Sequence, residues 1–366
     1  MVDVVTGTGG PAFHTLGRSG LRVSRLGLGT MTFGQPGWGC DERTAGDLLD
    51  TYLESGGNVV DTADIYAGGE TERILGRLIA DRGVRDRLVL TSKFSLGVRP
   101  GDPNAGGNGR KALLRSLHGS LERLGTDHLD VYFLHAWDGI TPAEEVARTL
   151  DDVVRAGLVR YVALSDVPAW YAARVQTLAQ WRGYEPMCAL QLEYSLAERG
   201  VELEFPSLCQ ELGMGLVTWG PLANGLLSGA YSAVAADPDG AELPEGRLKA
   251  TAAQRNPATD KRNPRTWRVV RELDRVAAEL GVSAAQVAVA WVLQRPAVGT
   301  VLLGARRVPQ LADTLAAQHL ALPSELVARL DEASAPPRTV PYGFLASLQS
   351  RINAGVTAKP AGYDAR

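Results

Sequence analysis

Four residues with titratable side chains lie at or just beyond the ends of three apolar stretches of this chain. Asp61 follows the first stretch, with Tyr66 five positions later, Lys93 follows the second and His135 follows the third. Burying a charged group at a strand end is costly unless the group is paired or used, so packing alone explains three such endings poorly. A phenol beside an ammonium can exchange a proton, a carboxylate can hold the ammonium, and an imidazole can orient a substrate oxygen. The set is typical of an oxidoreductase.

Each of these residues also has an ordinary structural explanation. Asp61 and Lys93 could form a structural ion pair, Tyr66 could be a loop aromatic, and His135 could be a hydrogen-bonded core histidine. Their joint occurrence at matching strand ends favours the catalytic interpretation.

The elements that must position these residues alternate along the chain as strand and helix. A hairpin is expected over residues 13–23, followed by eight short strands. Four strands are expected to end near Gly29, Asp61, Lys93 and His135, and four to span 159–164, 188–192, 215–218 and 300–303. The pattern between them predicts helices over 41–54, 70–82, 110–124, 142–156, 168–181 and 206–212.

This alternation indicates a parallel sheet with crossover helices, either an open doubly wound sheet or a (β/α)8 barrel. An open dinucleotide-binding sheet carries G-x-G-x-x-G after its first strand, but the segment from Gly27 to Thr32 lacks the third glycine. Titratable residues at three successive strand ends match a barrel, whose active sites form at the carboxyl ends of the strands. We therefore predict an α/β fold, a (β/α)8 TIM barrel with an N-terminal hairpin cap. It forms a single domain over 1–366, with its core at about 15–335.

Composition limits the possible partners and compartments. The 366 residues carry a formal net charge of −3, which gives no reason to expect nucleic-acid binding. No apolar run is long enough to span a bilayer and the N-terminus lacks a signal-peptide pattern, so we expect a cytoplasmic protein without a membrane partner. The three cysteines form no CxxC pair, so we expect reduced thiols and no metal site.

Eight short motifs follow one another along the chain. They are GLGTMTFG (27–34), DTADIYAGGETERILG (61–76), TSK (91–93), FLHAWD (133–138), VRYVALS (159–165), LQLEYSL (190–196), VTWGPLANGLLSG (217–229) and VLLGARRVPQLADTL (301–315). Together they resemble the aldo-keto reductase superfamily over nearly the whole chain. The subgroup is similar to bacterial members that also resemble potassium-channel β subunits and deoxysugar or aryl-alcohol reductases.

The resemblance implies a barrel that binds NADPH without a Rossmann fold and reduces an aldehyde or ketone. Asp61, Tyr66, Lys93 and His135 fall on the family's catalytic tetrad. Lys93 is then expected to lower the pKa of Tyr66, the general acid/base, while Asp61 holds Lys93 and His135 orients the carbonyl. An NADPH-binding redox-sensing subunit with little turnover is the alternative.

The resemblance also implies a cofactor site. Ser165 and Gln191 are expected on the nicotinamide carboxamide and Trp219 on its ring, while backbone amides of Gly220, Leu222, Asn224 and Gly225 are expected to face the pyrophosphate. Arg306 and Arg307 are expected near a 2′-phosphate, which favours NADPH over NADH. The full expected set is Gly29, Thr30, Met31, Ser165, Asp166, Gln191, Trp219, Gly220, Pro221, Leu222, Asn224, Gly225, Gly304, Arg306, Gln310 and Asp313.

Two positions depart from the family pattern. Asp166 stands where the family usually has Asn, and Thr314 replaces a common Asn near the adenine. A carboxylate accepts hydrogen bonds but cannot donate one, and it favours the positively charged oxidised cofactor. Both departures leave the strength of the NADPH preference open.

Substrate recognition is less constrained by the sequence. Phe33, Trp38 and Trp137 are candidates for the pocket wall, and Trp170, Trp181 and Trp291 are expected to be packing residues. The substrate could be an aromatic aldehyde, a ketosugar or a polyketide-like ketone. Homo-oligomerisation is possible, and the oligomeric state is open.

Two segments break the strand–helix rhythm. Residues 229–266 are too long and too rich in Pro, Gly and Ala for an ordinary connection, so we expect a lid or a disordered loop. A basic cluster over 247–275 is expected as a solvated helix face, with a lid over the cofactor phosphates as the alternative. The tail 336–366 carries Tyr342, Phe344 and Leu345, which predict docking on the body near the substrate pocket.

Overall fold

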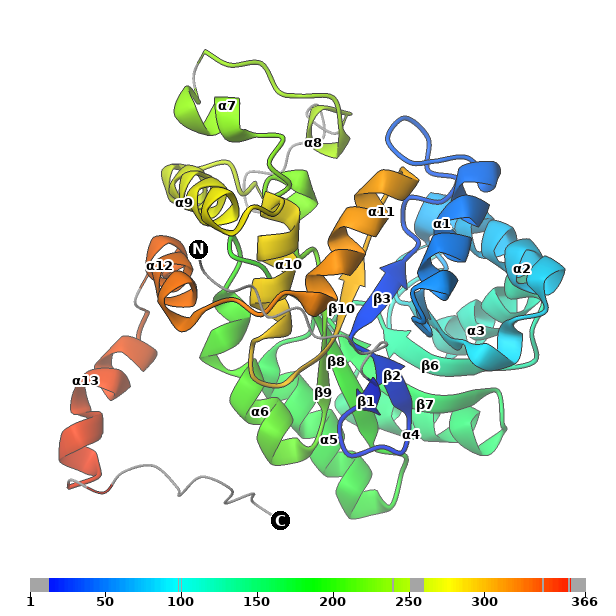
Figure 1. Cartoon of the computed structure of the whole chain (residues 1–366). Coiled ribbons are helices and arrows are strands. Elements are labelled where there is room, and N and C mark those ends of the chain that lie inside the picture. The colour runs from blue at the N-terminus through cyan, green and yellow to red at the C-terminus, as the bar shows by residue number, and fades with distance from the viewer. Residues whose placement is uncertain are drawn as a thin grey trace.

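The structure is a computed structural model of the chain (Figure 1). It describes residues 13–97, 99, 101–238, 240–250, 260–337, 339–354 and 356. Part of the expected lid (251–259, with Arg255 of the basic cluster) and the end of the tail (357–366) lie outside the described residues.

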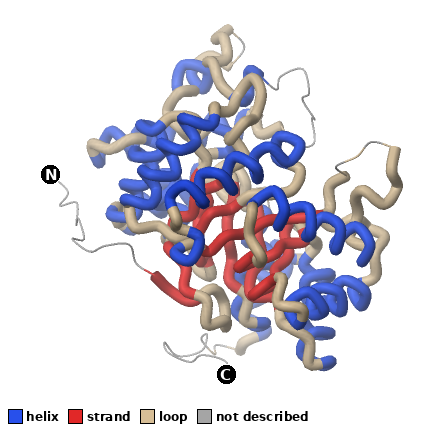
Figure 2. Tube along the Cα trace, turned by 90° about the vertical axis from the view of Figure 1, so that its right-hand side faces the viewer, coloured by secondary structure: helices blue, strands red, loops and turns tan. Residues whose placement is uncertain are grey.

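Within the described residues, eight parallel strands close into a barrel in the order β10-β3-β4-β5-β6-β7-β8-β9. Figure 2 shows these strands at the centre of the molecule with the helices around them. The strands are β3 (Leu26–Gly29), β4 (Val59–Asp61), β5 (Val89–Phe94), β6 (Leu129–Leu134), β7 (Val159–Ser165), β8 (Met187–Glu193), β9 (Gly215–Trp219) and β10 (Val298–Leu303). The predicted TIM barrel is confirmed.

A two-stranded hairpin, β1 (Phe13–Thr15) and β2 (Arg22–Ser24), precedes the barrel as predicted. Its turn docks closely on the barrel: the Arg18 N–H donates to Gly213 O at 2.9 Å. Gly17 has φ +58°, and a Cβ there would lie 2.6 Å from the carbonyl oxygen of Cys188, so this contact requires glycine. Leu16 and Val23 join the apolar cluster inside the barrel. The hairpin therefore closes the amino-terminal end of the barrel.

Helices cover the outside of the barrel and begin at recognisable caps. The side chain of Asp41 accepts from the Thr44 N–H at the start of α1, as its sequence position predicts, and Ser283 caps α10 in the same way. The helices of the first half are α1 (Glu42–Glu54), α2 (Glu70–Arg82), α3 (Arg110–Leu124), α4 (Ala143–Arg155), α5 (Ala169–Arg182) and α6 (Phe205–Leu212). Those of the second half are α9 (Pro264–Leu280), α10 (Ala284–Leu293), α11 (Val308–Leu315) and α12 (Ser324–Ser334). Short 3-10 turns are η1 (Tyr66–Gly69), η2 (Arg85–Arg87), η3 (Gly200–Leu203), η4 (Ala223–Gly225) and η6 (Ala316–His319).

The long segment after β9 contains two short helices, α7 (Ser232–Ala236) and α8 (Arg247–Ala250). Figure 1 shows both at the opposite end of the barrel from the hairpin. The described parts of segment 229–266 thus lie beyond the carboxyl ends of the strands.

The last helix, α13 (Tyr342–Ile352), projects away from the body in Figure 1. Phe344 and Leu345 are 62% and 45% exposed, so docking of these apolar side chains, expected from the sequence, is not what the structure shows. The Tyr342 hydroxyl contacts the carboxylate of Glu204.

No single described helix is long and apolar enough to cross a membrane. The helices α9 and α10, which meet at an angle of 98°, satisfy the length and composition criteria only as a bent pair.

Candidate active site

The alternation of side chains along each strand sends the predicted catalytic groups to one place. Val59, Val89 and Val131 belong to the apolar cluster that fills the barrel interior. Because side chains two positions apart on a strand share a face, residues 61, 93 and 135 also point inward, at the carboxyl end of the barrel. The same parity applies to Ser165, Gln191 and Trp219, which follow inward-facing Ala163, Ala189 and Val217. Six site residues thus derive from six different strands.

Asp61 and Lys93 form a fully enclosed ion pair. Lys93 is 0% exposed and Asp61 3%, and the Lys93 ammonium lies 2.5 Å from Asp61 Oδ2. The other carboxylate oxygen, Oδ1, accepts from the Thr91 hydroxyl at 2.7 Å and from the Gln191 amide at 2.9 Å. Lys93 also donates to the carbonyl oxygen of Thr62 at 2.9 Å. Burial works to lower the pKa of Lys93, but the Asp61 carboxylate raises it overall, so Lys93 is charged.

Thr30, which directly follows β3, is hydrogen-bonded to Asp61 at the end of β4. Thr30 donates both its backbone N–H (3.0 Å) and its hydroxyl (2.9 Å) to the carbonyl oxygen of Asp61. Gly29 is the register partner of Asp61, and Met31 is half-buried beyond it. Thr30 therefore serves to position Asp61.

Tyr66 reaches this pair from the turn η1. Its phenol oxygen lies 3.4 Å from the Lys93 ammonium nitrogen, and the ammonium lies 5.1 Å from the centre of the Tyr66 ring. The turn is sharp: Ala67 adopts φ 46°, in the left-handed region. Burial raises the pKa of Tyr66 above its ordinary value, and the Lys93 charge opposes this rise without cancelling it. The Lys93 charge thus acts in the direction expected from the sequence, and because burial outweighs it the phenol is protonated at neutral pH.

His135 lies beside Tyr66 at the end of β6. The two rings meet edge to face with centroids 5.9 Å apart, and the His135 N–H of the backbone donates to Phe94 O at 2.8 Å. Burial lowers the pKa of His135 to about 3, so the imidazole is neutral at physiological pH, and the Lys93 charge acts in the same direction. Its buried Nδ1 has no hydrogen-bond partner in the described part of the chain.

Ser165, Asp166 and Trp219 line the other side of the barrel mouth. Ser165 is 1% exposed, and its hydroxyl oxygen meets hydrogen-bond geometry with no described group. Asp166 adopts φ 44° and accepts from the Trp219 indole N–H at 3.3 Å. Burial raises the pKa of Asp166 to about 7, although the Trp219 hydrogen bond works against the rise. The sequence identified Asp166 as a departure, and the structure shows that its carboxyl can be protonated near neutrality.

Gln191 is hydrogen-bonded to the ion pair, and its contact with the carboxamide stays a prediction. Its side-chain amide donates to Asp61, so in this structure it supports the ion pair rather than standing free at the mouth.

The loop after β9 has the strained backbone of a turn that presents amides to a ligand. Gly220 (φ 68°), Ala223 (φ 48°), Asn224 (φ 59°) and Gly225 (φ 98°) are all left-handed. The Gly225 N–H donates to Leu222 O at 2.9 Å, and its contact with a pyrophosphate stays a prediction. Gly220, Leu222 and Asn224 keep their expected place in this loop, with Pro221 between them.

The start of α11 carries the predicted 2′-phosphate site. The Arg306 guanidinium donates to the carbonyl oxygen of Glu245 at 3.0 Å, and its backbone N–H donates to the Gln310 side chain at 3.2 Å. Gly304 is exposed just before it. Asp313 accepts from Ser283 and Gln286, each at 2.7 Å, and so joins α11 to α10. The contact of Asp313 with the adenosine end stays a prediction.

Of the three predicted pocket-wall aromatics, two lie at the surface of the mouth and one does not. Phe33 is 0% exposed and belongs to the apolar core, so its expected role in the pocket wall is wrong. Trp137 is 37% exposed and meets Trp170 edge to face at 5.7 Å. Trp170, Trp181 and Trp291 were expected to be packing residues, but Trp170 and Trp181 are 58% and 82% exposed, and of these three only Trp291 is buried.

Segment 242–250 lies over the barrel mouth, close to Trp38 and Tyr66. The Arg247 guanidinium lies 4.9 Å from the centre of the Trp38 ring, and it is close enough to Tyr66 to respond to its charge. Lys261, also of the basic cluster, pairs with Glu193 at 3.0 Å. The expectation of a solvated helix face is therefore wrong for these two residues, whereas Lys249 and Arg275 are exposed.

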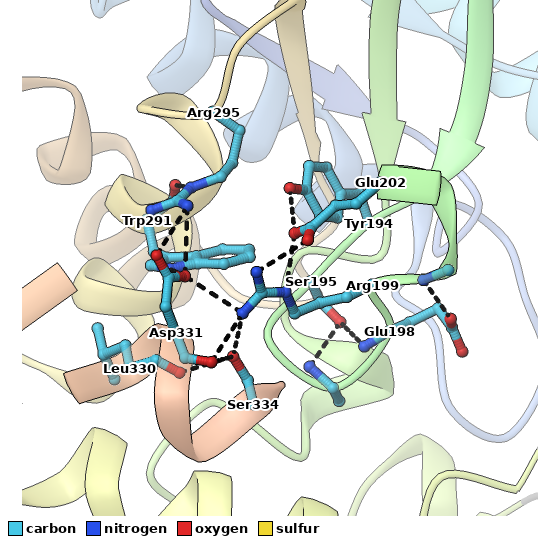
Figure 3. Close-up of polar contacts among 12 residues, drawn as sticks. Tyr194, Ser195, Glu198, Arg199, Glu202, Trp291, Arg295, Leu330, Asp331 and Ser334 are labelled. Carbon is cyan, nitrogen blue, oxygen red and sulfur yellow. Dashed lines mark hydrogen bonds and ion pairs between the residues drawn. The ribbon is translucent and has the colours of Figure 1, made fainter. Parts of the chain in front are cut away.

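A polar network that the sequence did not predict fixes the loop between β8 and α6 (Figure 3). Arg199 donates twice to the Glu202 carboxylate, at 2.8 Å each, and once to the Ser334 hydroxyl at 2.8 Å. The Trp291 ring lies between the Arg199 guanidinium (5.1 Å) and that of Arg295 (4.2 Å). Partners separated by about 130 residues leave no local sequence signal.

This network adjoins the site through one residue. The Tyr194 hydroxyl donates to Glu202 at 2.6 Å, and its backbone N–H donates to the carbonyl oxygen of Trp219 at 3.1 Å. Helix α12 is thus connected through Arg199, Glu202 and Tyr194 to the strand end that carries Trp219.

Comparisons with known proteins agree with this geometry. The aldo/keto reductase family profile matches residues 25–335. The chain is 34% identical to norsolorinic acid reductase A of Aspergillus parasiticus over 89% of this chain and 82% of that protein. It is 34% identical to an aryl-alcohol dehydrogenase of Pestalotiopsis microspora, over 89% and 82% of the two chains. It is also 35% identical to a probable voltage-gated potassium channel subunit beta of Oryza sativa subsp. japonica, over 90% and 99%.

A barrel whose strand ends gather a carboxylate, an ammonium, a phenol and an imidazole agrees with a family match that covers most of the chain. This protein belongs to the aldo/keto reductase family of oxidoreductases.

Proposed function

We propose that this protein reduces an aldehyde or ketone to the alcohol with NADPH, and that Tyr66 is its general acid and base. The observation that carries the proposal is the position of the buried Lys93 ammonium, 2.5 Å from Asp61 and 3.4 Å from the Tyr66 oxygen. Burying a charged lysine between a carboxylate and a phenol costs free energy of folding, so a role in stability alone does not explain it.

The residues at the mouth fit a nicotinamide cofactor. The buried Ser165 hydroxyl lacks a partner and suits the carboxamide, and the partly exposed Trp219 ring suits stacking. The left-handed loop from Gly220 to Asn224 suits a pyrophosphate. When bound, the cofactor supplies or accepts the hydride, while the protein supplies geometry and electrostatics.

Tyr66 gives the proton to the carbonyl oxygen in the reduction direction. Its raised pKa keeps the proton on the phenol at neutral pH, and the adjacent Lys93 charge stabilises the phenolate as the proton leaves. His135 is neutral and carries one ring N–H, which can hydrogen-bond the same carbonyl oxygen and orient it. Asp61 keeps Lys93 charged and in place through the reaction.

The preference for NADPH rests on Arg306. Its guanidinium is half-buried at the start of α11, where a helix amino terminus and a fork of N–H donors suit a phosphate monoester. In the structure this fork binds the carbonyl oxygen of Glu245, in the segment over the mouth. We infer that the 2′-phosphate replaces this carbonyl when the cofactor binds and that segment 242–250 acts as a lid.

The carbonyl substrate is proposed to be aromatic. Trp137 and Trp38 present rings at the mouth, and flat rings favour stacking with a flat substrate. The printed names of two relatives, a norsolorinic acid reductase and an aryl-alcohol dehydrogenase, support the same class.

A second candidate function is an NADPH-binding regulatory subunit with little turnover. It is favoured by the relative named as a potassium channel subunit beta, which this chain matches over 99% of that protein. Consumption of excess NADPH with aromatic aldehydes, small dicarbonyls and ketosugars separates the two. An enzyme oxidises many equivalents with at least one substrate, whereas tight binding followed by oxidation of about one equivalent supports the regulatory subunit.

A further inference from the structure

An aromatic cluster with exposed rings lies next to the catalytic groups, where the loop after β6 meets the start of α5. Trp137 is 37% exposed and Trp170 58%, and their rings meet edge to face with centroids 5.7 Å apart. The buried Tyr171 ring lies 6.0 Å from the Trp137 ring and 5.5 Å from the Trp170 ring, centre to centre. We call Trp137, Trp170 and Tyr171 the aromatic shelf.

The fold places the aromatic shelf at the barrel mouth. Trp137 follows His135 by two residues, and its backbone N–H donates to the carbonyl oxygen of Asp166 at 3.2 Å. Trp170 is the second residue of α5, which follows the carboxyl end of β7. Because the active sites of (β/α)8 barrels form at the carboxyl ends of the strands, the shelf extends the proposed site outward from His135.

Hydrogen bonds fix the loop that carries Trp137. The Asp138 carboxylate accepts from the backbone N–H groups of Ile140 at 3.0 Å and of Thr141 at 2.9 Å, and from the Thr141 hydroxyl at 2.6 Å. The Tyr171 hydroxyl donates to the carbonyl oxygen of Thr141 at 3.4 Å and so joins α5 to this loop. The shelf is therefore preorganised, and a ligand that binds to it does not have to order it first.

The same helix carries another exposed tryptophan, which serves as a comparison. Trp181 lies near the other end of α5 and is 82% exposed, and it makes no ring–ring or cation–π contact with the described residues. A single exposed apolar side chain is common on protein surfaces. Contacting aromatic rings that stay exposed beside a reaction centre are typical of a binding site. Trp170 therefore needs an explanation that Trp181 does not.

We propose that Trp170 determines substrate specificity by stacking a second aromatic ring of the substrate, linked to the ring that carries the carbonyl group. This inference rests on the proposed carbonyl reduction, and it narrows the aromatic substrate class to molecules with at least two rings.

The position of Trp170 explains why a second ring is required. Among the described residues, Trp170 meets the rings of Trp137 and Tyr171 but not that of His135. A substrate whose only ring lies at His135 and Trp137 therefore does not extend to Trp170, whereas a second ring does. Aromatic rings favour offset or edge-to-face contacts with one another, and an exposed indole ring offers a surface for either.

Steady-state reduction of two aldehydes by the full-length protein with saturating NADPH tests the proposal. The aldehydes are benzaldehyde, which has one ring, and biphenyl-4-carbaldehyde, which has two. We expect kcat/KM for biphenyl-4-carbaldehyde to exceed that for benzaldehyde about tenfold, because the second ring is stacked and partly removed from water. A wild-type ratio of one or less would overturn the proposal.

Three variants locate the second ring. Trp170→Ala removes the stacking surface and is expected to lower the ratio of the two kcat/KM values about fivefold to tenfold, whereas Trp170→Phe keeps a ring and most of the ratio. Trp181→Ala, on the same helix, is the matched control and is expected to keep the wild-type ratio. Thermal unfolding of each variant confirms that it folds. A ratio that is unchanged in Trp170→Ala, or that falls equally in Trp181→Ala, would overturn the proposal.

Binding of two amides that cannot be reduced separates this proposal from the reductase activity. Biphenyl-4-carboxamide and benzamide are titrated calorimetrically into the protein saturated with NADP⁺. The Kd of the two-ring amide is expected to be about tenfold lower, and Trp170→Ala is expected to remove most of this difference. That result in a protein that oxidises no NADPH would support the shelf and refute the reductase. Turnover of benzaldehyde with no preference for a second ring in either assay would refute the shelf and leave the reductase intact.

Discussion

The ammonium nitrogen of Lys93 lies 3.4 Å from the phenol oxygen of Tyr66, and Lys93 is completely enclosed by the barrel. At this distance the positively charged ammonium directly stabilises a negative charge that forms on the phenol oxygen. Because Lys93 is not exposed to water, solvent does not screen the interaction between the two groups. The chemistry proposed for the site depends on this relationship.

Lys93→Met is expected to abolish most of the turnover while the barrel still folds. The phenolate of Tyr66 loses its counter-charge, so kcat for carbonyl reduction should fall about 100-fold or more. The variant also leaves Asp61 buried with only Thr91 and Gln191 as partners, which should lower the free energy of unfolding by about 3–5 kcal/mol. Steady-state kinetics and urea unfolding measure the two effects. Lys111→Met, at an exposed position on α3, should change neither.

The carboxyl of Asp166 should make cofactor binding depend on pH near neutrality. Its pKa is raised to about 7 by burial, with Glu193 adding to the rise and Trp219, Lys93 and Ser165 opposing it. Below pH 7 the protonated carboxyl is neutral and can donate a hydrogen bond, whereas above pH 7 the carboxylate favours the positively charged NADP⁺. The ratio of the Kd for NADPH to the Kd for NADP⁺ should therefore rise about 3- to 10-fold between pH 6 and pH 8.

Asp166→Asn removes this titration and should make the same ratio flat over that range. Fluorescence titrations with both cofactor forms at several pH values provide the comparison. A ratio that changes with pH equally in wild type and variant assigns the effect to another group.

Arg306→Gln should reduce the preference for the phosphorylated cofactor. Loss of the guanidinium should raise the KM for NADPH about tenfold or more and leave the KM for NADH nearly unchanged. Arg307→Gln changes the exposed neighbour, which makes no side-chain hydrogen bond or ion pair with the described residues, and should have a smaller effect. An unchanged NADPH/NADH preference in Arg306→Gln would show that the 2′-phosphate binds elsewhere.

Arg199→Met should destabilise the fold. Arg199 is 9% exposed and joins Glu202, Ser334 and the Trp291 ring, so its loss leaves the Glu202 carboxylate with the Tyr194 hydroxyl alone (Figure 3). The expected cost is about 3–5 kcal/mol in the free energy of unfolding. Arg174→Met removes an exposed pair with Glu144 and should cost less than about 1 kcal/mol. Equal costs for the two variants would contradict a structural role for the network.

The sequence predicts the barrel and the meeting of its catalytic groups because both follow from short-range patterns. Strand period, turn residues and caps such as Asp41 depend on neighbours within a few positions. Once the strands are parallel and adjacent, the parity of residues 61, 93 and 135 sends their side chains to one end of the barrel. The expected element boundaries accordingly agree with the structure to within one or two residues for most elements.

Features that depend on long-range packing were not predictable in the same way. Phe33 lies in a glycine-rich loop next to the mouth, and only the tertiary structure shows that its ring turns into the core. The net pKa of Tyr66 depends on how completely it is buried, which its neighbours in sequence do not report. The exposed Phe344 and Leu345 of α13 show that apolar residues in a tail need not dock.

The central claim is that Tyr66 transfers the proton, and Tyr66→Phe tests it most directly. The variant keeps the ring beside His135 and removes only the hydroxyl. We predict that it binds NADPH with the Kd of wild type, while kcat for reduction of a good aldehyde substrate falls by about 100-fold or more. Turnover within a few-fold of wild type, with cofactor binding intact, would contradict the account and require another proton donor at the barrel mouth.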